Sequence, residues 1–260
     1  MASSFFNLTE FQASNVIDTI TIGDSILVGV SAYKPSESIN LPLAIKQKTV
    51  AYKSGIWETA IIHEYSISNK GVNNVSNLLM AFFADWNIDE PKANNIAFNQ
   101  ELNLFYTYNH SNQILYTGIC LLSPGNTLPY GFDLVTGGNG GIDITDNYTN
   151  EEKWFTMNNS RTHAGNDGDS IDIASLLTAG PYTIAQDDSI TIVWALIAAK
   201  NQYELTEIAL TLKENYLLSS KEQLLFTNQI SVYPNPANDF ILIDNSRGNT
   251  EMQIQLYNSI

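Results

Sequence analysis

The chain has 260 residues, 44% of them apolar, and carries 27 acidic against 12 basic residues, for a net charge of −15. This length and apolar content are enough for one large domain or two unequal ones. A surface this acidic repels nucleic acid and anionic lipid, so neither is an expected partner. Apolar runs all fall short of the roughly 18 residues that span a membrane, so no membrane span is expected.

Short apolar stretches with polar punctuation fill the first 85 residues. Strands are predicted at residues 20–22, 26–30 and 41–45, separated by Gly, Asp, Ser and Pro. Apolar and polar residues then alternate from 61 to 69, and a further extended run covers 75–85. The alternation places His63 on one face of a strand, where we expect it to be packed or hydrogen-bonded.

A hairpin is predicted in the middle of the chain, from residues 102–108 and 114–122 around a polar turn at 110–112. The single cysteine, Cys120, lies in the second of these runs and is expected to be a small buried hydrophobe. Residues 123–150 are rich in Gly, Asn and Thr, which predicts a long irregular segment with one short strand at 132–135. The Gly-rich run at 137–141 lacks the Lys-Ser/Thr pair of a phosphate loop.

A long buried strand at 190–199 and an amphipathic helix near 205–217 close the main part of the chain. A short helix or turn is expected at 154–157. Many short strands with long polar loops predict an all-β fold, mainly an antiparallel β-sandwich. The helix follows from apolar residues at helical spacing: Leu205, Ile208, Ala209, Leu212 and Tyr216.

Residues 230–244 have the pattern of a strand, a stiff turn and a second strand, because two prolines interrupt apolar residues of high β propensity. This stretch resembles the first strand of the C-terminal sorting domain of type IX secretion cargo. The resemblance divides the chain into a β-sandwich module at 1–226 and a partial small β domain, a truncated sorting domain, at 227–260. The matching motif residues are Tyr233, Pro234, Asn235, Pro236, Ala237 and Asp239.

The resemblance implies a protein that is secreted or held on the outer cell surface, with the type IX machinery as a partner. The N-terminus has no basic segment followed by a long apolar one, so no signal peptide is expected there. The sorting family also continues for about twice the length present here. We therefore expect the chain to be a fragment of a longer precursor.

Two acid-rich stretches are candidate calcium ligands, since hard cations need several oxygen ligands. Neither has the spacing of an EF-hand, and the alternative is a solvated strand end or loop. The three histidines lack zinc-site spacing. No cofactor is expected, with calcium as the one alternative. The candidate ligands are Asp85, Asn87 and Asp89 in the first stretch and Asp167, Asp169 and Asp172 in the second.

The chain lacks the His-Gly-Thr and Gly-Thr-Ser-Met-Ala contexts of subtilisin-like peptidases and the Gly-x-Ser-x-Gly elbow of many hydrolases. Residues 60–216 are similar to a non-catalytic β module that follows a catalytic region, often subtilisin-like, in secreted surface proteins. Asn87 stands where that module usually has an acid, which weakens a cation site. The resemblance implies a non-enzymatic accessory module, with an upstream catalytic domain as partner.

Two alternatives remain open. The chain could be a fragment of a secreted hydrolase, either a subtilisin-like peptidase or a carbohydrate-active enzyme. It could also be a glycan-binding or adhesin module whose aromatic side chains form stacking platforms; exposed aromatics would favour this alternative. The candidate platforms are Trp86, Tyr106, Tyr108, Tyr130 and Trp154.

Overall fold

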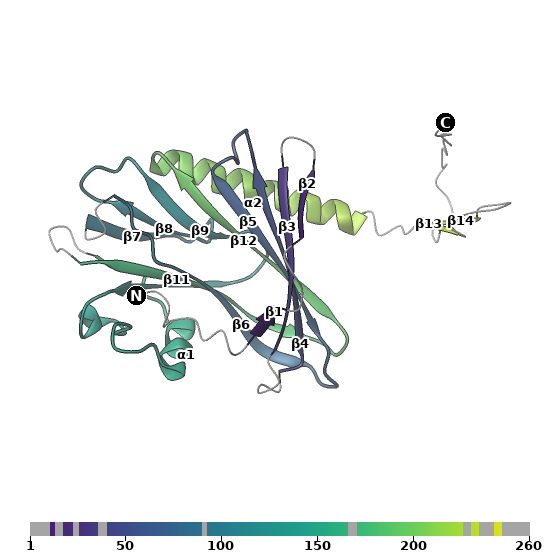
Figure 1. The fold of residues 1–260 in the computed structure, drawn as a ribbon, viewed down its shortest axis with the longest axis horizontal. Helices are drawn as coiled ribbons and strands as arrows, with labels where there is room; N and C mark the ends of the chain where they lie inside the picture. Colours follow the sequence, from purple (N-terminus) through teal and green to yellow (C-terminus); the bar gives the residue numbers. More distant parts are fainter. Residues whose placement is uncertain are drawn as a thin grey trace. The chain divides into compact units, whose positions relative to one another are not determined.

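The computed structural model describes residues 11–13, 18–22, 26–35, 41–89, 93–165, 171–225, 230–233 and 242–245. The chain forms two compact units, Met1–Glu214 and Asn215–Ile260. Antiparallel strands make up most of the first unit and face each other in two sheets, which confirms the predicted β-sandwich (Figure 1). In the described part, no helix is long and apolar enough to cross a membrane.

The larger sheet has nine strands in the order β1-β3-β4-β5-β12-β9-β8-β7, with β2 also paired to β3 (Figure 1). β12 is the predicted buried strand, and it lies between β5 and β9. The strands are β1 (Phe11–Ala13), β2 (Asp18–Ile22), β3 (Ile26–Pro35), β4 (Leu43–Tyr52), β5 (Ala60–Asn69), β7 (Asn94–Asn99), β8 (Leu104–Asn109), β9 (Tyr116–Leu121) and β12 (Ser189–Ala199).

The smaller sheet has the order β10-β11-β6, from β10 (Thr127–Asp133), β11 (Ile173–Ile184) and β6 (Val75–Ala84). The main core lies between the two sheets and includes fully buried side chains of β8, β9, β11 and β12. Such burial of apolar surface is the main favourable term in folding. Among these side chains are Phe105, Ile119, Leu121, Leu177 and Trp194.

The segment after residue 123 contains a longer strand than predicted. The sequence predicts a short strand at 132–135, but β10 begins at Thr127 and pairs with β11 over seven residues, to Asp133. Pro129 makes this segment look unlike a strand in the sequence, because proline lacks the N–H that a central strand needs. β10 is the edge of its sheet, where proline is tolerated.

Helix α2 (Gln202–Leu225) buries Leu205, Ile208, Ala209 and Leu212, as its periodicity predicts. It is bonded to strand β8 of the large sheet, where Gln202 Nε2 donates to Tyr106 Oη (2.9 Å). The helix begins earlier than the predicted residue 205 because Asn201 Oδ1 accepts from the backbone N–H of Glu204 (2.9 Å) and caps its first turn.

Helix α1 (Asn150–Asn158) confirms the short helix expected at 154–157. A capping box starts it: the Thr149 side chain accepts from the Glu152 N–H, and the Glu152 carboxylate accepts from the Thr149 N–H. α1 contacts β10 and β11, beside a second apolar cluster around Tyr130 and Phe132. A single 3-10 turn, η3 (Gly138–Gly140), lies between β10 and α1.

The described part of the second unit contains a hairpin of β13 (Ile230–Tyr233) and β14 (Leu242–Asn245), paired antiparallel with Tyr233 opposite Leu242. The two strands agree with the strands that the sequence predicts at the two ends of 230–244. The other sorting-motif residues, Pro234, Asn235, Pro236, Ala237 and Asp239, lie outside the described residues.

Candidate functional site

A row of uncharged polar side chains crosses three neighbouring strands of the large sheet. Strand alternation and register place them on one face, since Ser31 is opposite Gln47 and Thr49 is opposite His63. His63 is in turn opposite the buried Trp194, so this is the face that continues into the core. We call these five residues the polar ladder: Ser31 and Tyr33 of β3, Gln47 and Thr49 of β4, and His63 of β5.

Hydrogen bonds run along the polar ladder from β3 to β5. The Ser31 hydroxyl donates to Tyr33 Oη (3.1 Å), which donates to Gln47 Oε1 (3.1 Å). Gln47 Nε2 donates to Thr49 Oγ1 (3.1 Å) and lies 3.2 Å from His63 Nδ1. Thr49 Oγ1 lies 3.0 Å from the same nitrogen. Because an amide nitrogen only donates, Nδ1 is the acceptor and carries no proton.

The polar ladder begins where the sandwich core ends. The His63 ring stacks on Phe82 of β6, the edge strand of the small sheet, with ring centroids 5.8 Å apart. Phe82 in turn lies 6.1 Å from Trp194. β6 is the last strand on this side of the small sheet in the described part of the chain. The ladder is therefore anchored on the core at its His63 end.

The environment keeps these groups neutral at physiological pH. Burial lowers the pKa of His63 below its ordinary value of 6.5, because the imidazolium form loses its hydration. Burial, with a smaller effect of Tyr33, raises the pKa of Tyr65 to about 12. Tyr65 is the cross-strand neighbour of Gln47 on the same face. The site therefore offers hydroxyl, amide and imidazole groups without a formal charge.

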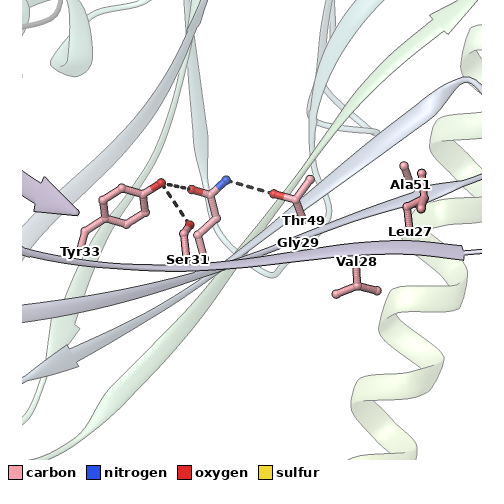
Figure 2. A pocket seen from close by; sticks show the side chains of 8 residues that line it. Leu27, Val28, Gly29, Ser31, Tyr33, Thr49 and Ala51 are labelled. Carbon is pink, nitrogen blue, oxygen red and sulfur yellow. Dashed lines mark hydrogen bonds between the residues drawn. The ribbon is translucent and has the colours of Figure 1, made fainter. Parts of the chain in front are cut away.

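A pocket of about 290 Å³ lies over the ladder on β3 and β4 (Figure 2). The hollow follows from small residues on facing positions: Gly29 has no side chain and is opposite Thr49, while Leu27 is opposite Ala51. Leu27 and Ala51 form an apolar end, and Ser31, Tyr33, Gln47 and Thr49 form a polar end. Figure 2 shows Val28 pointing away, to the other side of β3.

The structure brings together two of the predicted calcium ligands, one from each acidic stretch. Asp85 follows β6 and Asp172 precedes β11, and these strands are paired. Burial, and then repulsion from Asp172, raise the pKa of the Asp85 carboxyl. Asp89 instead accepts from Asn112 Nδ2 (2.6 Å), and Asn87 is exposed. Asp167 and Asp169 lie outside the described residues.

Across the described ranges, no three His, Cys, Asp or Glu side chains gather as they do around a metal ion. Calcium sites at Asp85, Asn87 and Asp89 and at Asp167, Asp169 and Asp172 stay predictions from the sequence.

The candidate stacking aromatics differ in exposure. Tyr106 and Tyr130 are buried, while Trp154 on α1 is 59% exposed. Tyr108 stacks on Tyr116, with centroids 5.4 Å apart and an interplanar angle of 12°. Trp86 is partly buried against the main core. Most of these rings therefore pack inside the protein, and Trp154 is the one of the five that presents an open face.

A thiol and a buried carboxylate elsewhere in the fold have structural roles. The Cys120 thiol is fully buried and donates to the Leu102 carbonyl (3.3 Å), and burial raises its pKa to about 12. This confirms the predicted buried hydrophobe. The buried Asp133 pairs with Arg161, which also donates to the Gly131 carbonyl (2.8 Å). That ion pair, which sequence reasoning missed, fastens the segment after α1 to β10.

The polar ladder was also missed, although each strand carried a signal. Polar residues at alternate positions, such as Ser31 and Tyr33 or Gln47 and Thr49, mark one polar face on an otherwise apolar strand. Only the register shows that the three polar faces meet. The prediction that His63 is hydrogen-bonded on an alternating strand is confirmed.

No protein-family model matches the chain, and no curated protein matches it in sequence. Among solved structures, it is similar to heparan sulfate lyase HepC from Pedobacter heparinus, with a TM-score of 0.38, 10% identity, and coverage of 74% of this chain and 22% of that one. It is also similar to the heparinase III BT4657 gene product (TM-score 0.38, 10% identity, 75% and 22%) and to a heparinase III (0.35, 6%, 75% and 22%). The chain thus spans less than a quarter of these enzymes, and the similarity carries no information about ligand or activity.

Proposed function

We propose that this chain is a non-catalytic binding module of a secreted or cell-surface protein, and that the pocket over the polar ladder binds a neutral glycan. The observation that carries the proposal is the ladder itself: five uncharged polar side chains, hydrogen-bonded in one row, beside a pocket of about 290 Å³. Binding pockets commonly combine an apolar surface with a few fixed polar groups.

The chemistry of the pocket matches a sugar ring in two ways. Sugar hydroxyls can hydrogen-bond to the Ser31, Tyr33 and Gln47 side chains, while the C–H face of a ring can pack against Leu27 and Ala51. The ladder is held in place by its own hydrogen bonds, so little side-chain freedom is lost on binding. The net charge of −15 also disfavours sulfated or carboxylated chains at long range.

A non-catalytic role is supported by the state of the titratable groups at the site. His63 and Tyr65 are neutral and partly buried, and the charged neighbours Lys48 and Glu64 alternate to the opposite face. The buried Asp133 is paired with Arg161 in another part of the fold. General acid–base chemistry needs a positioned donor or acceptor with a matched pKa, and the ladder offers polar contacts instead.

Calorimetry with neutral hexasaccharides of glucose, xylose, mannose and N-acetylglucosamine tests this function, with a heparin hexasaccharide as the anionic comparison. We expect binding of at least one neutral chain and a Kd weaker by about five- to tenfold in Gln47→Ala, since a lost hydrogen bond costs about 1–1.5 kcal/mol. Lys48→Ala is the matched control, because Lys48 is next to Gln47 on β4 but points to the opposite face. Equal losses in both variants, or turnover of any sugar, would contradict the proposal.

We propose further that the module is exported by the type IX system. The strand pair β13–β14, which brackets the motif beginning at Tyr233, supports this proposal. The test is made in the natural host with the complete precursor. Tyr233→Ala together with Asp239→Ala is expected to retain the protein in the cell, whereas Asp244→Ala, outside the motif, is expected to leave secretion intact.

A further inference from the structure

We infer that His63 is a proton switch that sets whether Ser31 offers a hydrogen-bond acceptor or a donor to a ligand in the pocket. This inference rests on the proposed function, because it names what the same pocket selects. It follows from the direction of the hydrogen bonds in the polar ladder, which is fixed at one end by the single nitrogen Nδ1 of His63.

With His63 neutral, the donors at the Ser31 and Tyr33 end of the ladder are used inside the ladder. The Ser31 hydroxyl donates to Tyr33 Oη, and the Tyr33 hydroxyl donates to Gln47 Oε1. Gln47 Nε2 donates to Thr49 Oγ1, and the single lone pair of His63 Nδ1 is shared by the second Gln47 N–H and the Thr49 hydroxyl. Ser31 and Tyr33 therefore have only lone pairs left for the pocket. A ligand group that contacts these two residues must donate, as a sugar hydroxyl does and a sulfate does not.

Protonation of His63 reverses this arrangement. The imidazolium takes one proton from solvent at Nδ1, so Nδ1 becomes a donor and its contact with Gln47 Nε2 becomes donor against donor. Rotation of the Gln47 amide by half a turn restores the bonds: Oε1 accepts from His63, and Nε2 donates to Tyr33 Oη. Tyr33 then donates to Ser31, and the Ser31 hydroxyl is freed to donate into the pocket.

The surroundings of His63 contain few other groups that could respond to pH. β4 contributes Gln47 and Thr49, β6 contributes Phe82, and β12 contributes Trp194 as the cross-strand neighbour. The titratable groups facing it in the described strands are Tyr65 and, further along the ladder, Tyr33. Tyr65 stays neutral far above the range in which His63 titrates, because burial raises its pKa to about 12. Burial lowers the pKa of His63, so the switch operates on the acidic side of 6.5.

NMR of the unliganded, isotope-labelled chain between pH 8 and 4 tests the switch without any ligand. Above the midpoint of His63, nuclear Overhauser effects from the Gln47 amide protons should reach the Thr49 methyl group. Below it, they should reach the Tyr33 ring protons beside the hydroxyl. His163→Gln is the control and should leave the transition unchanged.

A second variant, Gln47→Glu, gives an independent readout. A carboxylate accepts from both Tyr33 and His63 Nδ1–H, so it should raise the pKa of His63 by one unit or more while Tyr33 keeps donating to residue 47. Amide contacts that do not change while His63 titrates would overturn the inference. So would a His63 that stays neutral until the protein unfolds, or an unchanged His63 pKa in Gln47→Glu.

Measurement of sugar binding at two pH values separates this inference from the proposed function. A neutral hexasaccharide that binds at pH 7.5 should bind about tenfold more weakly one pH unit below the His63 midpoint, as expected for one lost hydrogen bond. A pH-independent Kd would contradict the switch but leave glycan binding intact. Amide rotation without binding of any neutral sugar would contradict the proposed function and leave the switch intact.

Discussion

Asp85 and Asp172 place two carboxyl groups beside each other at neighbouring ends of β6 and β11. Burial and then this repulsion raise the pKa of Asp85 above its ordinary value of 3.8. A raised folded-state pKa means that the folded protein binds the proton more tightly than the unfolded chain. Its contribution to stability is therefore fully present below about pH 3.8 and is lost as the pH rises through the folded-state pKa.

Asp85→Asn should accordingly stabilise the protein at pH 7. The expected gain is a few tenths of a kcal/mol, because the residue as a whole is exposed, its carboxyl is only partly buried, and solvent screens the repulsion. Urea unfolding at pH 7 and pH 3.5 measures it, and the gain should disappear at the lower pH. The exposed Asp146→Asn is the control. A melting temperature that rises with calcium in the wild type alone would instead show that the two carboxylates hold a cation.

At the scale of single residues, the sequence predicts burial better than it predicts which side chains contact each other. Cys120 lies in an apolar run, which predicts that it is buried, and the structure confirms this. The contacts of Asp85 with Asp172 and of Gln47 with His63 depend on strand register between segments far apart in the chain. Register is decided by packing of the whole sheet, so it is not visible in a local pattern.

The start of α1 depends on one reciprocal pair of hydrogen bonds between Thr149 and Glu152. Thr149→Ala removes the acceptor for the Glu152 N–H and should destabilise the protein by about 1 kcal/mol, the usual cost of a lost N-cap. Urea unfolding followed by circular dichroism measures the change.

The neighbouring acid provides the comparison. Glu151→Gln changes a residue beside the box without touching it, and Glu152→Gln keeps a side chain that can still accept from the Thr149 N–H. Both should cost much less than Thr149→Ala. A loss as large in Glu151→Gln would mean that charge in the first turn, rather than the capping bonds, supports the helix.

At the scale of elements, helices and strands with a strong periodic pattern of apolar residues were predicted best. The α2 face from Leu205 to Leu212 was found from spacing alone. The capping box was also written in the sequence, as Thr149 followed three residues later by Glu152, but it precedes a helix with only a weak apolar face and was missed. Pro129 normally argues against a strand, yet β10 begins at Thr127, five residues before the predicted strand at 132.

The division of the chain into two compact units makes a prediction about the whole molecule. Both buried apolar clusters lie in Met1–Glu214, so deletion of residues 226–260 should change the free energy of unfolding by less than about 0.5 kcal/mol. A deletion from residue 204 onward removes Leu205, Ile208 and Leu212 from the large sheet and should abolish cooperative unfolding.

Hydrogen exchange gives a second measurement of the same division. Backbone amides of β12 should exchange slowly, because β12 is paired on both sides. Those of β13 should exchange quickly, because a two-stranded hairpin of four-residue strands is marginal by itself. Equal protection of both strands, or collapse of the fold on deletion of 226–260, would show that the second unit supports the first.

The position of β12 has a consequence for synthesis on the ribosome. β5 and β9 are synthesised before β12, the strand that pairs with both and ends at Ala199. Until β12 has been synthesised, β5 and β9 each have an unpaired edge. At about 5–20 residues per second, the interval from residue 121 to residue 199 lasts about 4–16 s. During that time the nascent chain exposes strand edges that pair readily with other chains. The expected signs of this late-joining strand are chaperone capture at these edges and a lower yield of soluble protein when translation is slowed at constant temperature.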